Sequence, residues 1–333
     1  MDLHALLVNL TSPSLLYFLL GVLATVVKSD LELPAPTIKF ISLYLLFSIG
    51  FKGGQELAHS GFTPEVLAAL GAALALALTV PVYTYFLLRR VLDVYNAGAL
   101  AAAYGSVSAV TFITASSFLD DHRVAYGGHM VAAMALMEAP AIIIGLLLIR
   151  RFAPAPDPAD PADPATADAP ARAGGLGAIA HEAFTNGSVL MIVGSLVIGL
   201  LADSKAAEGI KPFTSDIFKG FLAVFLLEMG MVAARRFGAF RRAGWALVVL
   251  GLVLPLLGAS LGIGLSRWLH LTPGDGLLLT VLAASASYIA VPAALRLAVP
   301  QADPGIYLPM ALAVTFPFNI ALGIPLYFHL LTR

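Results

Sequence analysis

Ten apolar segments, most of them long enough to cross a lipid bilayer, dominate this 333-residue sequence. A membrane-spanning helix needs about 20 apolar residues, and fewer where it is interrupted or covered by neighbouring helices. We therefore expect an all-α polytopic membrane protein with ten transmembrane helices. In the first half the segments cover 12–27, 36–49, 64–88, 96–118 and 126–149; in the second half they cover 185–202, 212–232, 244–269, 276–298 and 304–331.

The composition agrees with a membrane environment and argues against several functions. Hydrophobic residues make up 59% of the chain and charged residues 12%, and the formal net charge of -1 gives no field that would attract nucleic acid. The chain has no cysteine, which excludes disulfides and thiolate sites. It also lacks the P-loop, GxSxG and HExxH motifs. We expect neither an enzyme nor a bound cofactor, so an ion gradient must drive any transport.

The second half of the chain repeats the first. We place the first five-span repeat at 1–151, a linker rich in Pro, Ala and Asp at 152–177, and the second repeat at 178–333. When the halves are overlaid, AAYGSVSA at 102–109 falls on AASASYIA at 283–290, and at the same offset Glu138 falls on Asn319. Because five is an odd number, the second copy crosses the membrane in the opposite sense. This is the inverted-repeat architecture of secondary transporters.

Basic residues at the ends of the predicted spans indicate the orientation of the protein, because cytoplasmic loops are enriched in Lys and Arg. Arg89 and Arg90, Arg150 and Arg151, and four arginines between 235 and 242 fall on one face if the third, fifth and seventh spans end there. The sequence thus predicts a multi-pass protein of the plasma membrane, with the linker in the cytoplasm and both termini outside.

Runs of small and hydroxylated residues interrupt the fourth and ninth spans at matching positions. Interrupted helices survive in a membrane only where they are buried or line a cavity, so these runs indicate a binding site. Half-helix N-termini can seat a small anion, and hydroxyls can coordinate sodium. The alternative is that small residues merely let helices pack closely. The candidate residues are Gly105, Ser106, Ser108 and Thr111 in the first run and Ser285, Ser287, Tyr288 and Pro292 in the second.

Glu138, in the middle of the fifth span, is the most prominent single polar group. An ionisable side chain at this depth is costly unless it faces a partner or a cavity. Its repeat equivalent, Asn319, also lies in a proline-interrupted span. We expect these residues to act as cation ligands or as a proton carrier; the alternative is an interhelical hydrogen bond that fixes packing. The expected sodium ligands are Ser106, Ser108, Glu138 and Ser287.

Other polar groups in the spans favour structural interpretations. Glu228, and Asp216 with Lys219, are explained by local pairing or by side chains that reach the interface. His129 has no second histidine at the spacing that a zinc site needs. Gly258 and Gly262 form one GxxxG spacing, which is a common packing feature.

The stretches YGSVSAVTFITASS, MEAPAIIIG and VLAASASYIAVPAALRLAVPQADPGIYL resemble the SbtA-type family of sodium-dependent bicarbonate transporters. The resemblance covers nearly the whole chain apart from the linker. It implies ten spans in inverted repeats, a core part and a gate part, and a homotrimer. It also implies a sodium and anion site between the fourth and ninth spans, and a small PII-like regulator that docks on the cytoplasmic face.

The chain departs from the pattern of this family in the ninth span. Where other members carry an acidic residue followed by Ser-Gly-Pro-Pro, this chain has Tyr288, Ile289, Ala290, Val291 and Pro292. In the fifth span the usual Asp is replaced by Glu138, which keeps the acid and lengthens it by one methylene group. A bulky Tyr288 can reshape the pocket for another small anion.

The leading hypothesis is a permease that moves bicarbonate or a similar small anion in symport with sodium. Three alternatives remain open at this point. The protein can be a membrane receptor or sensor that keeps the fold, a transporter of a different small anion such as a monocarboxylate, or a channel. Its expected partners are the small anion, sodium and the lipid bilayer.

Overall fold

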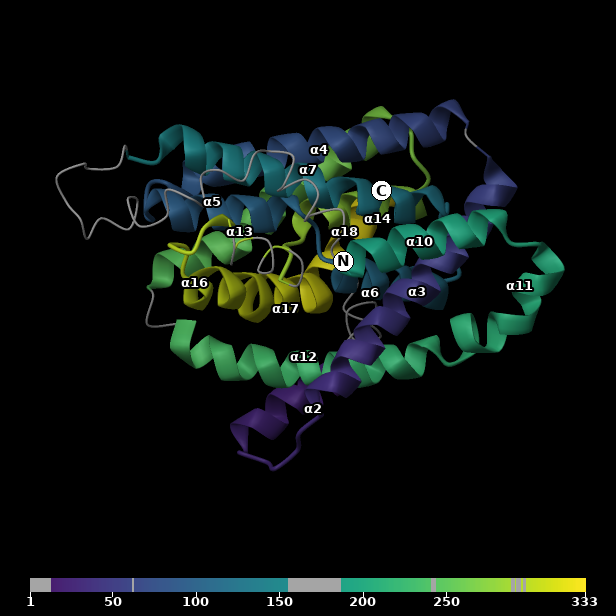
Figure 1. Ribbon diagram of the computed structural model, residues 1–333, viewed down its shortest axis with the longest axis horizontal. Helices are drawn as coiled ribbons and strands as arrows, with labels where there is room; N and C mark the ends of the chain where they lie inside the picture. Colours follow the sequence, from purple (N-terminus) through teal and green to yellow (C-terminus); the bar gives the residue numbers. More distant parts are fainter. Residues whose placement is uncertain are drawn as a thin grey trace.

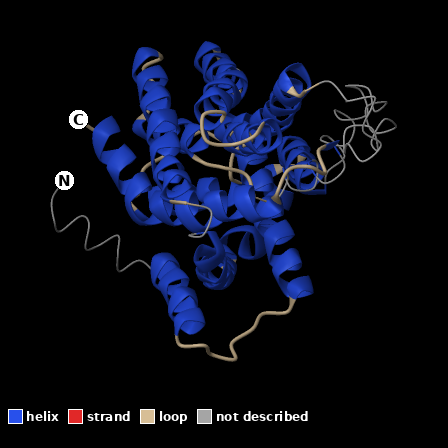
Figure 2. Cartoon of the chain, turned by 90° about the vertical axis from the view of Figure 1, so that its left-hand side faces the viewer, coloured by secondary structure: helices blue, strands red, loops and turns tan. Residues whose placement is uncertain are grey.

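The computed structural model describes residues 13–61, 63–154, 187–240, 244–288, 291, 295 and 298–333, and this part of the chain is helical without any strand (Figures 1 and 2). The helices of the first half are α2 (Pro13–Val26), α3 (Ala35–Ser60), α4 (Pro64–Leu88), α5 (Val94–Gly105), α6 (Ala109–Asp121) and α7 (His129–Phe152). Those of the second half are α10 (Gly187–Leu201), α11 (Ser204–Lys211), α12 (Phe218–Phe240), α13 (Trp245–Trp268), α14 (Pro273–Ala284), α16 (Pro304–Pro309), α17 (Phe316–Phe318) and α18 (Ile324–Leu331).

Each of the ten predicted segments contains a helix, and seven helices among the described residues meet the length and composition needed to cross a membrane. In this count the pair α5–α6 and the chain from α16 to α18 are each taken as one. Three shorter apolar helices, Leu15–Val26, Val189–Leu201 and Pro273–Ala284, fall on the first, sixth and ninth predicted spans. Short π-helical turns, Pro212–Asp216, Met310–Thr315 and Asn319–Gly323, join the helices near several prolines, which lack the N–H that a regular turn needs.

The predicted boundaries are least accurate for the second span. Apolar residues predict it at 36–49, whereas α3 continues to Ser60. Its additional turns contain Lys52, Gln55 and Glu56, and the apolar pattern ends before them. These side chains are accommodated because Gln55 donates to the Ala202 carbonyl on the neighbouring segment and Lys52 pairs with Asp120. Most of the predicted linker, from residue 155 onward, lies outside the described residues.

The helices form two groups. The four-helix group consists of α2, α3, α10 and α12, in which α10 packs along α3 and α12 packs along α2. The core group contains α4 to α7, α13, α14 and α16 to α18, with α4 against α5 and α7, and α13 against α14. Figure 1 shows α4 and α7 at the top of the view, α12 at the bottom, and α3 and α10 toward the right.

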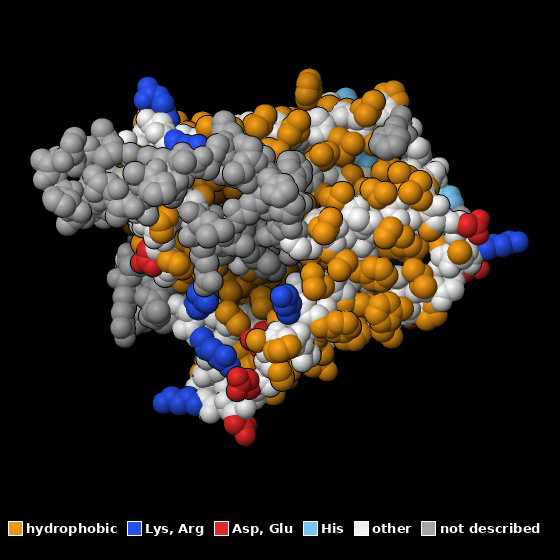
Figure 3. Space-filling view, in the orientation of Figure 1, with side chains coloured by type: hydrophobic (Ala, Val, Ile, Leu, Met, Phe, Trp, Pro, Cys, Tyr) orange, Lys and Arg blue, Asp and Glu red, His pale blue; other side chains and the backbone are white. Residues whose placement is uncertain are grey.

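Apolar side chains cover the surface that faces the lipid. Figure 3 shows a broad field of hydrophobic side chains over the middle and right of the view, with charged side chains mainly at its margins. Leu67, Leu190 and Leu201 are among the exposed large residues. Such a surface is typical of a membrane protein, because large exposed apolar patches are rare on soluble monomers.

Glycines set the spacing inside the four-helix group. A Cβ on Gly230 of α12 would lie 2.0 Å from the Phe18 carbonyl oxygen of α2, and a Cβ on Gly21 of α2 would lie 2.0 Å from the Leu227 carbonyl oxygen. These obstacles are main-chain atoms, so no side chain can move aside. The helices are in backbone contact, which is how membrane helices gain dispersion energy without a hydrophobic driving force.

Replacing Gly230 with Ala should lower the melting temperature of the purified protein in detergent. Overpacking costs about 1–3 kcal/mol, which exceeds the gain of about 1 kcal/mol in helix propensity. Gly220→Ala, on the same helix, is the control, because nothing lies within 4 Å of its added Cβ. The control should leave the melting temperature unchanged or raise it. An equal effect of both changes would contradict backbone contact at Gly230.

Candidate ion and anion site

The fourth span is interrupted where the sequence predicts it. Helix α5 ends at Gly105, and α6 begins at Ala109. Ser106 still donates its N–H to the Ala102 carbonyl, whereas Ser108 has extended φ and ψ angles and caps the new helix by accepting the Thr111 N–H at 3.2 Å. Serine is among the preferred N-cap residues for this reason. The interruption therefore follows from the residue types and places the N-terminal end of α6 inside the protein.

Helix α14 stops at Ala284, and the chain continues without helix from Ser285 to Tyr288. The Ser285 hydroxyl donates to the Leu282 carbonyl at 3.2 Å, which satisfies one of the carbonyls that the end of a helix leaves free. Pro292, the residue expected to restart the ninth span, lies outside the described residues.

The two interruptions cross and hydrogen-bond to each other. The Ser108 N–H donates to the Ser285 hydroxyl at 2.8 Å, and the Ser287 N–H donates to the Ala103 carbonyl at 2.7 Å. The four residues are buried. Each interruption thus supplies partners for main-chain groups that the other one leaves free, as a nonpolar environment requires.

One cavity lies beside this crossing. It brings together residues of the two interruptions and of α7, with further walls from α3, α10 and α12. Four of the predicted site residues, Ser108, Glu138, Ser287 and Tyr288, line it. Ala109 and Val110, the first residues of α6, line it as well. The positive end of the α6 dipole therefore faces the cavity together with a carboxyl group and hydroxyls.

Polar groups at and near the cavity have few partners within the described part of the chain. Glu138 is half-buried, and among the described residues no Lys, Arg or His forms an ion pair with it. The Tyr288 hydroxyl is buried beside Ser108, which is its polar neighbour at the cavity. The Ser106 hydroxyl is fully buried without a hydrogen-bond partner among the described residues, but Ser106 does not line the cavity. Unsatisfied buried groups are rare in native proteins, so they mark where a ligand can bind.

The remaining predicted residues have structural contacts. Gly105 is packed so closely that a Cβ would lie 2.3 Å from Pro81. Thr111 contributes the N–H that Ser108 caps. Asn319 does not line the cavity; its side-chain amide donates to the Ala284 carbonyl at 2.8 Å and accepts from the Tyr327 hydroxyl at 3.0 Å. Asn319 thereby caps the C-terminal end of α14, in line with the packing alternative.

Sequence reasoning missed two features of the site. Ser42 on α3 lines the cavity, but a lone serine on an apolar span carries no sequence signal. Tyr104, which precedes the first interruption, forms a 2.6 Å hydrogen bond with Thr315, whose hydroxyl donates to the Gly251 carbonyl. Since Thr315 uses its hydrogen on Gly251, Tyr104 is the donor. This chain of bonds fixes α5 against the tenth span and α13.

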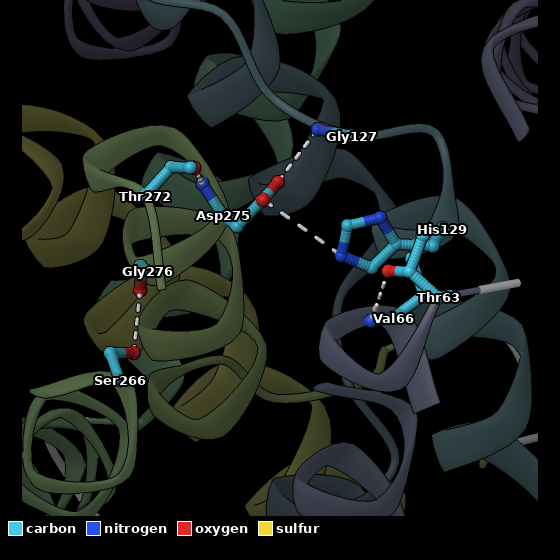
Figure 4. A network of polar contacts seen from close by, with 8 residues as sticks. All are labelled: Thr63, Val66, Gly127, His129, Ser266, Thr272, Asp275 and Gly276. Carbon is cyan, nitrogen blue, oxygen red and sulfur yellow. Dashed lines mark hydrogen bonds and ion pairs between the residues drawn. The ribbon is translucent and has the colours of Figure 1, made fainter. Parts of the chain in front are cut away.

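Polar contacts also tie the beginnings of α7 and α14 together (Figure 4). Asp275 accepts the Gly127 N–H at 2.6 Å, and its other carboxylate oxygen lies 3.9 Å from His129 Nε2. Thr272 caps α14 by accepting the Asp275 N–H. Gly258 and Gly262 of α13 lie against Ala283 and Thr280 of α14, which confirms the packing role predicted for that spacing. The cavity is thus held by a firmly connected core group.

Comparison with known families identifies the class of protein to which this site belongs. A family model described as the Na+-dependent bicarbonate transporter superfamily matches residues 13–332. Among curated proteins, none is similar enough in sequence to match the chain. The family match takes in both interruptions and all the candidate residues, and it confirms the resemblance drawn from the runs at the fourth and ninth spans. The chain belongs to the Na+-dependent bicarbonate transporter superfamily.

Proposed function

We propose that this protein is a secondary active transporter that carries bicarbonate together with sodium through the cavity beside the crossed interruptions. The observation that carries the proposal is the meeting of the two interruptions at one cavity that also holds Glu138. The family supports sodium and bicarbonate as the transported ions. The absence of a protein cation beside Glu138 among the described residues leaves its carboxylate free for a transported one.

The two ions would bind different groups of the same cavity. Sodium prefers hard oxygen ligands, and the Glu138 carboxylate with the hydroxyls of Ser108 and Ser287 supplies them at the cavity. Ser106, the fourth proposed ligand, does not line the cavity in this structure. The anion is attracted by the first turn of α6, whose free N–H groups carry partial positive charge. A bound sodium would also lower the electrostatic cost of placing an anion near Glu138, so each ion favours the binding of the other.

The packing of the four-helix group supports an inverted repeat. The first helix of the second half, α10, lies along the second helix of the first half, α3. In the reciprocal pair, α12 of the second half lies along α2 of the first half. A two-fold axis that exchanges the halves predicts this reciprocity. We propose that the core group, which carries the cavity, moves against the four-helix group to alternate access.

The proposed orientation places the ends of α4, α7 and α12 in the cytoplasm, with both chain termini outside and residues 152–177 inside. The ends of α4 and α7 lie together, since the Tyr85 and Phe152 rings stack at 5.5 Å beside Arg89 and Arg151. A common basic end is what the positive-inside rule requires. Assembly as a homotrimer and binding of a PII-like regulator at the basic end remain proposals based on the resemblance.

Purified protein in liposomes should take up labelled bicarbonate when an inward sodium gradient is imposed. Replacing sodium with potassium at equal ionic strength should reduce uptake to the level of empty liposomes, because the driving force is then lost. Uptake at the same rate without sodium would overturn the coupling. Binding of bicarbonate without any flux would instead support a receptor.

Replacing Glu138 with Gln should weaken sodium activation of uptake by about tenfold or more, the effect expected when a charged ligand is lost. The side chain keeps its size, so the fold should persist. Glu228→Gln is the matched control, since Glu228 is also half-buried in a span but does not line the cavity. The sodium dependence of uptake, measured for both variants, decides the role of Glu138. Equal effects of the two changes would remove Glu138 from the ion site.

The apolar walls of the cavity favour a second candidate substrate, a short monocarboxylate. Leu45, Leu46, Ile113, Ile192 and Phe225 line the same space as Ser108 and Glu138. Bicarbonate has no apolar surface to place against them, whereas burying each methylene of a carboxylate contributes about 0.8 kcal/mol.

Competition in the uptake assay distinguishes the two substrates. If the cavity is adapted to a monocarboxylate, unlabelled propionate should inhibit more strongly than formate, and excess bicarbonate less than either. Inhibition that does not rise with chain length would leave bicarbonate as the substrate.

A further inference from the structure

Two consecutive acidic residues, Asp120 and Asp121, occupy the last turn of α6. The C-terminal end of a helix carries partial negative charge, so carboxylates there destabilise the helix. Helix stability therefore does not explain them, and each has a lysine partner. Lys52 Nζ lies 3.7 Å from Asp120, and Lys219 Nζ lies 2.5 Å from Asp121.

The two lysines belong to the other group of helices. Lys52 is on α3 and Lys219 is on α12, both in the four-helix group, whereas α6 begins at the crossed interruptions of the core group. In addition, α3 and α12 fall on the second predicted span of each half. The two ion pairs thus join the far end of the interrupted helix to corresponding spans of the two halves.

A polar cleft lies at this junction. Its lining includes Lys52, Glu56, Asp120 and Tyr126. Along α3 it begins at Ile49, about one turn from the Leu45 and Leu46 that line the central cavity, and along α7 it ends at Val131, about one turn from Met134. The same helices therefore run from the cleft to the cavity, which makes the cleft the approach to the site from this end.

The two groups close this approach by direct contact. A Cβ on Gly128, just before α7, would lie 2.2 Å from the Gly53 carbonyl oxygen of α3, and a Cβ on Gly53 would lie 2.6 Å from Val131. Gly53 directly follows Lys52, so the backbone contact and the ion pair lie at one place. Access to the cavity from this end requires both to separate.

Each lysine has a second acid within one turn on its own segment. Glu56 follows Lys52 by four residues, and Asp216 precedes Lys219 by three. Side chains four residues apart on α3 are neighbours on the helical surface, and Asp216 ends the π-helical turn that leads into α12, so each lysine has a nearby acid when it leaves α6. All four paired side chains are between 38% and 51% exposed, which makes the pairs weak and readily exchanged.

We propose that Asp120 and Asp121 form an ionic latch with Lys52 and Lys219 that closes one end of the transport route, and that the latch opens when the lysines transfer to Glu56 and Asp216. This proposal rests on the proposed transport function, because a latch controls access only if ions pass through the cavity. Whether the latch is open or closed can nevertheless be measured without a transport assay.

The test uses the absence of native cysteine. Ser42→Cys places a single thiol in the central cavity, and a membrane-impermeant thiol reagent is applied to intact cells and to inside-out vesicles. Adding Asp120→Asn and Asp121→Asn should increase the labelling rate by about fivefold when the reagent is applied on the side of the membrane where α6 ends. This is the population shift expected when two exposed ion pairs are lost. Lys205→Gln, an exposed lysine of α11 without an ion pair among the described residues, is the charge control.

A change of opposite sign distinguishes a latch from general loosening. Glu56→Gln removes the competing partner of Lys52, so labelling should become slower than with the Ser42→Cys reporter alone. Exchanging the charges, with Lys52→Asp and Asp120→Lys, should restore slow labelling relative to the single Asp120→Asn change. A labelling rate that stays the same in all these variants would contradict the latch. A faster rate in the Glu56→Gln variant would contradict it as well.

Increasing the potassium chloride concentration tests the ion pairs without any substitution in the four latch residues. Salt screens exposed pairs, so labelling of the Ser42→Cys reporter should accelerate with ionic strength, and this dependence should vanish in the Asp120→Asn, Asp121→Asn background. A salt dependence that persists there would contradict the proposal. If labelling responds to the latch substitutions but uptake does not depend on sodium, the transport function is rejected and the latch is kept. If uptake is normal but labelling does not respond to the substitutions, the latch is rejected and the transport function is kept.

Discussion

Main-chain hydrogen bonding in a medium without water is the constraint on which the rest of this structure depends. A helix that stops inside the membrane leaves carbonyl and N–H groups that must find partners within the protein. Here the two interrupted spans are arranged so that each supplies partners to the other, through Ser108 with Ser285 and Ser287 with Ala103. Asn319 completes the set at Ala284. The cavity exists because these bonds allow two helices to end side by side.

This constraint also separates the polar groups that hold the site from those left for ligands. Ser285 uses its hydroxyl as donor and acceptor, and Asn319 uses both ends of its amide. Glu138 lines the same space and forms no ion pair among the described residues, so it is available for the proposed ligand. The polar side chains of the site therefore divide into those that hold the frame and those proposed to bind ions, according to the main-chain groups within their reach.

The sequence predicts the positions of the helices well, but it predicts poorly which polar side chains contact each other between helices. All ten apolar segments contain helices, and the serine run of the fourth span breaks where the small residues indicate. The role of Asn319 depends on a carbonyl, and every residue has a carbonyl, so nothing in the sequence marks Ala284 as its partner. Lys219 has a local acid at Asp216, yet it pairs with Asp121, 98 residues away. Such contacts are set by the tertiary packing of helices, which periodicity does not encode.

Because the crossing is made by main-chain groups, it places little limit on how far the two halves can differ in sequence. In the overlay of the two halves, Ala103 and Ala284 are equivalent, and both serve through their carbonyl oxygens. A contact made by the backbone survives most substitutions at its own position. The two halves can therefore differ at overlaid positions such as Glu138 and Asn319 while the contacts made by the Ala103 and Ala284 carbonyls persist.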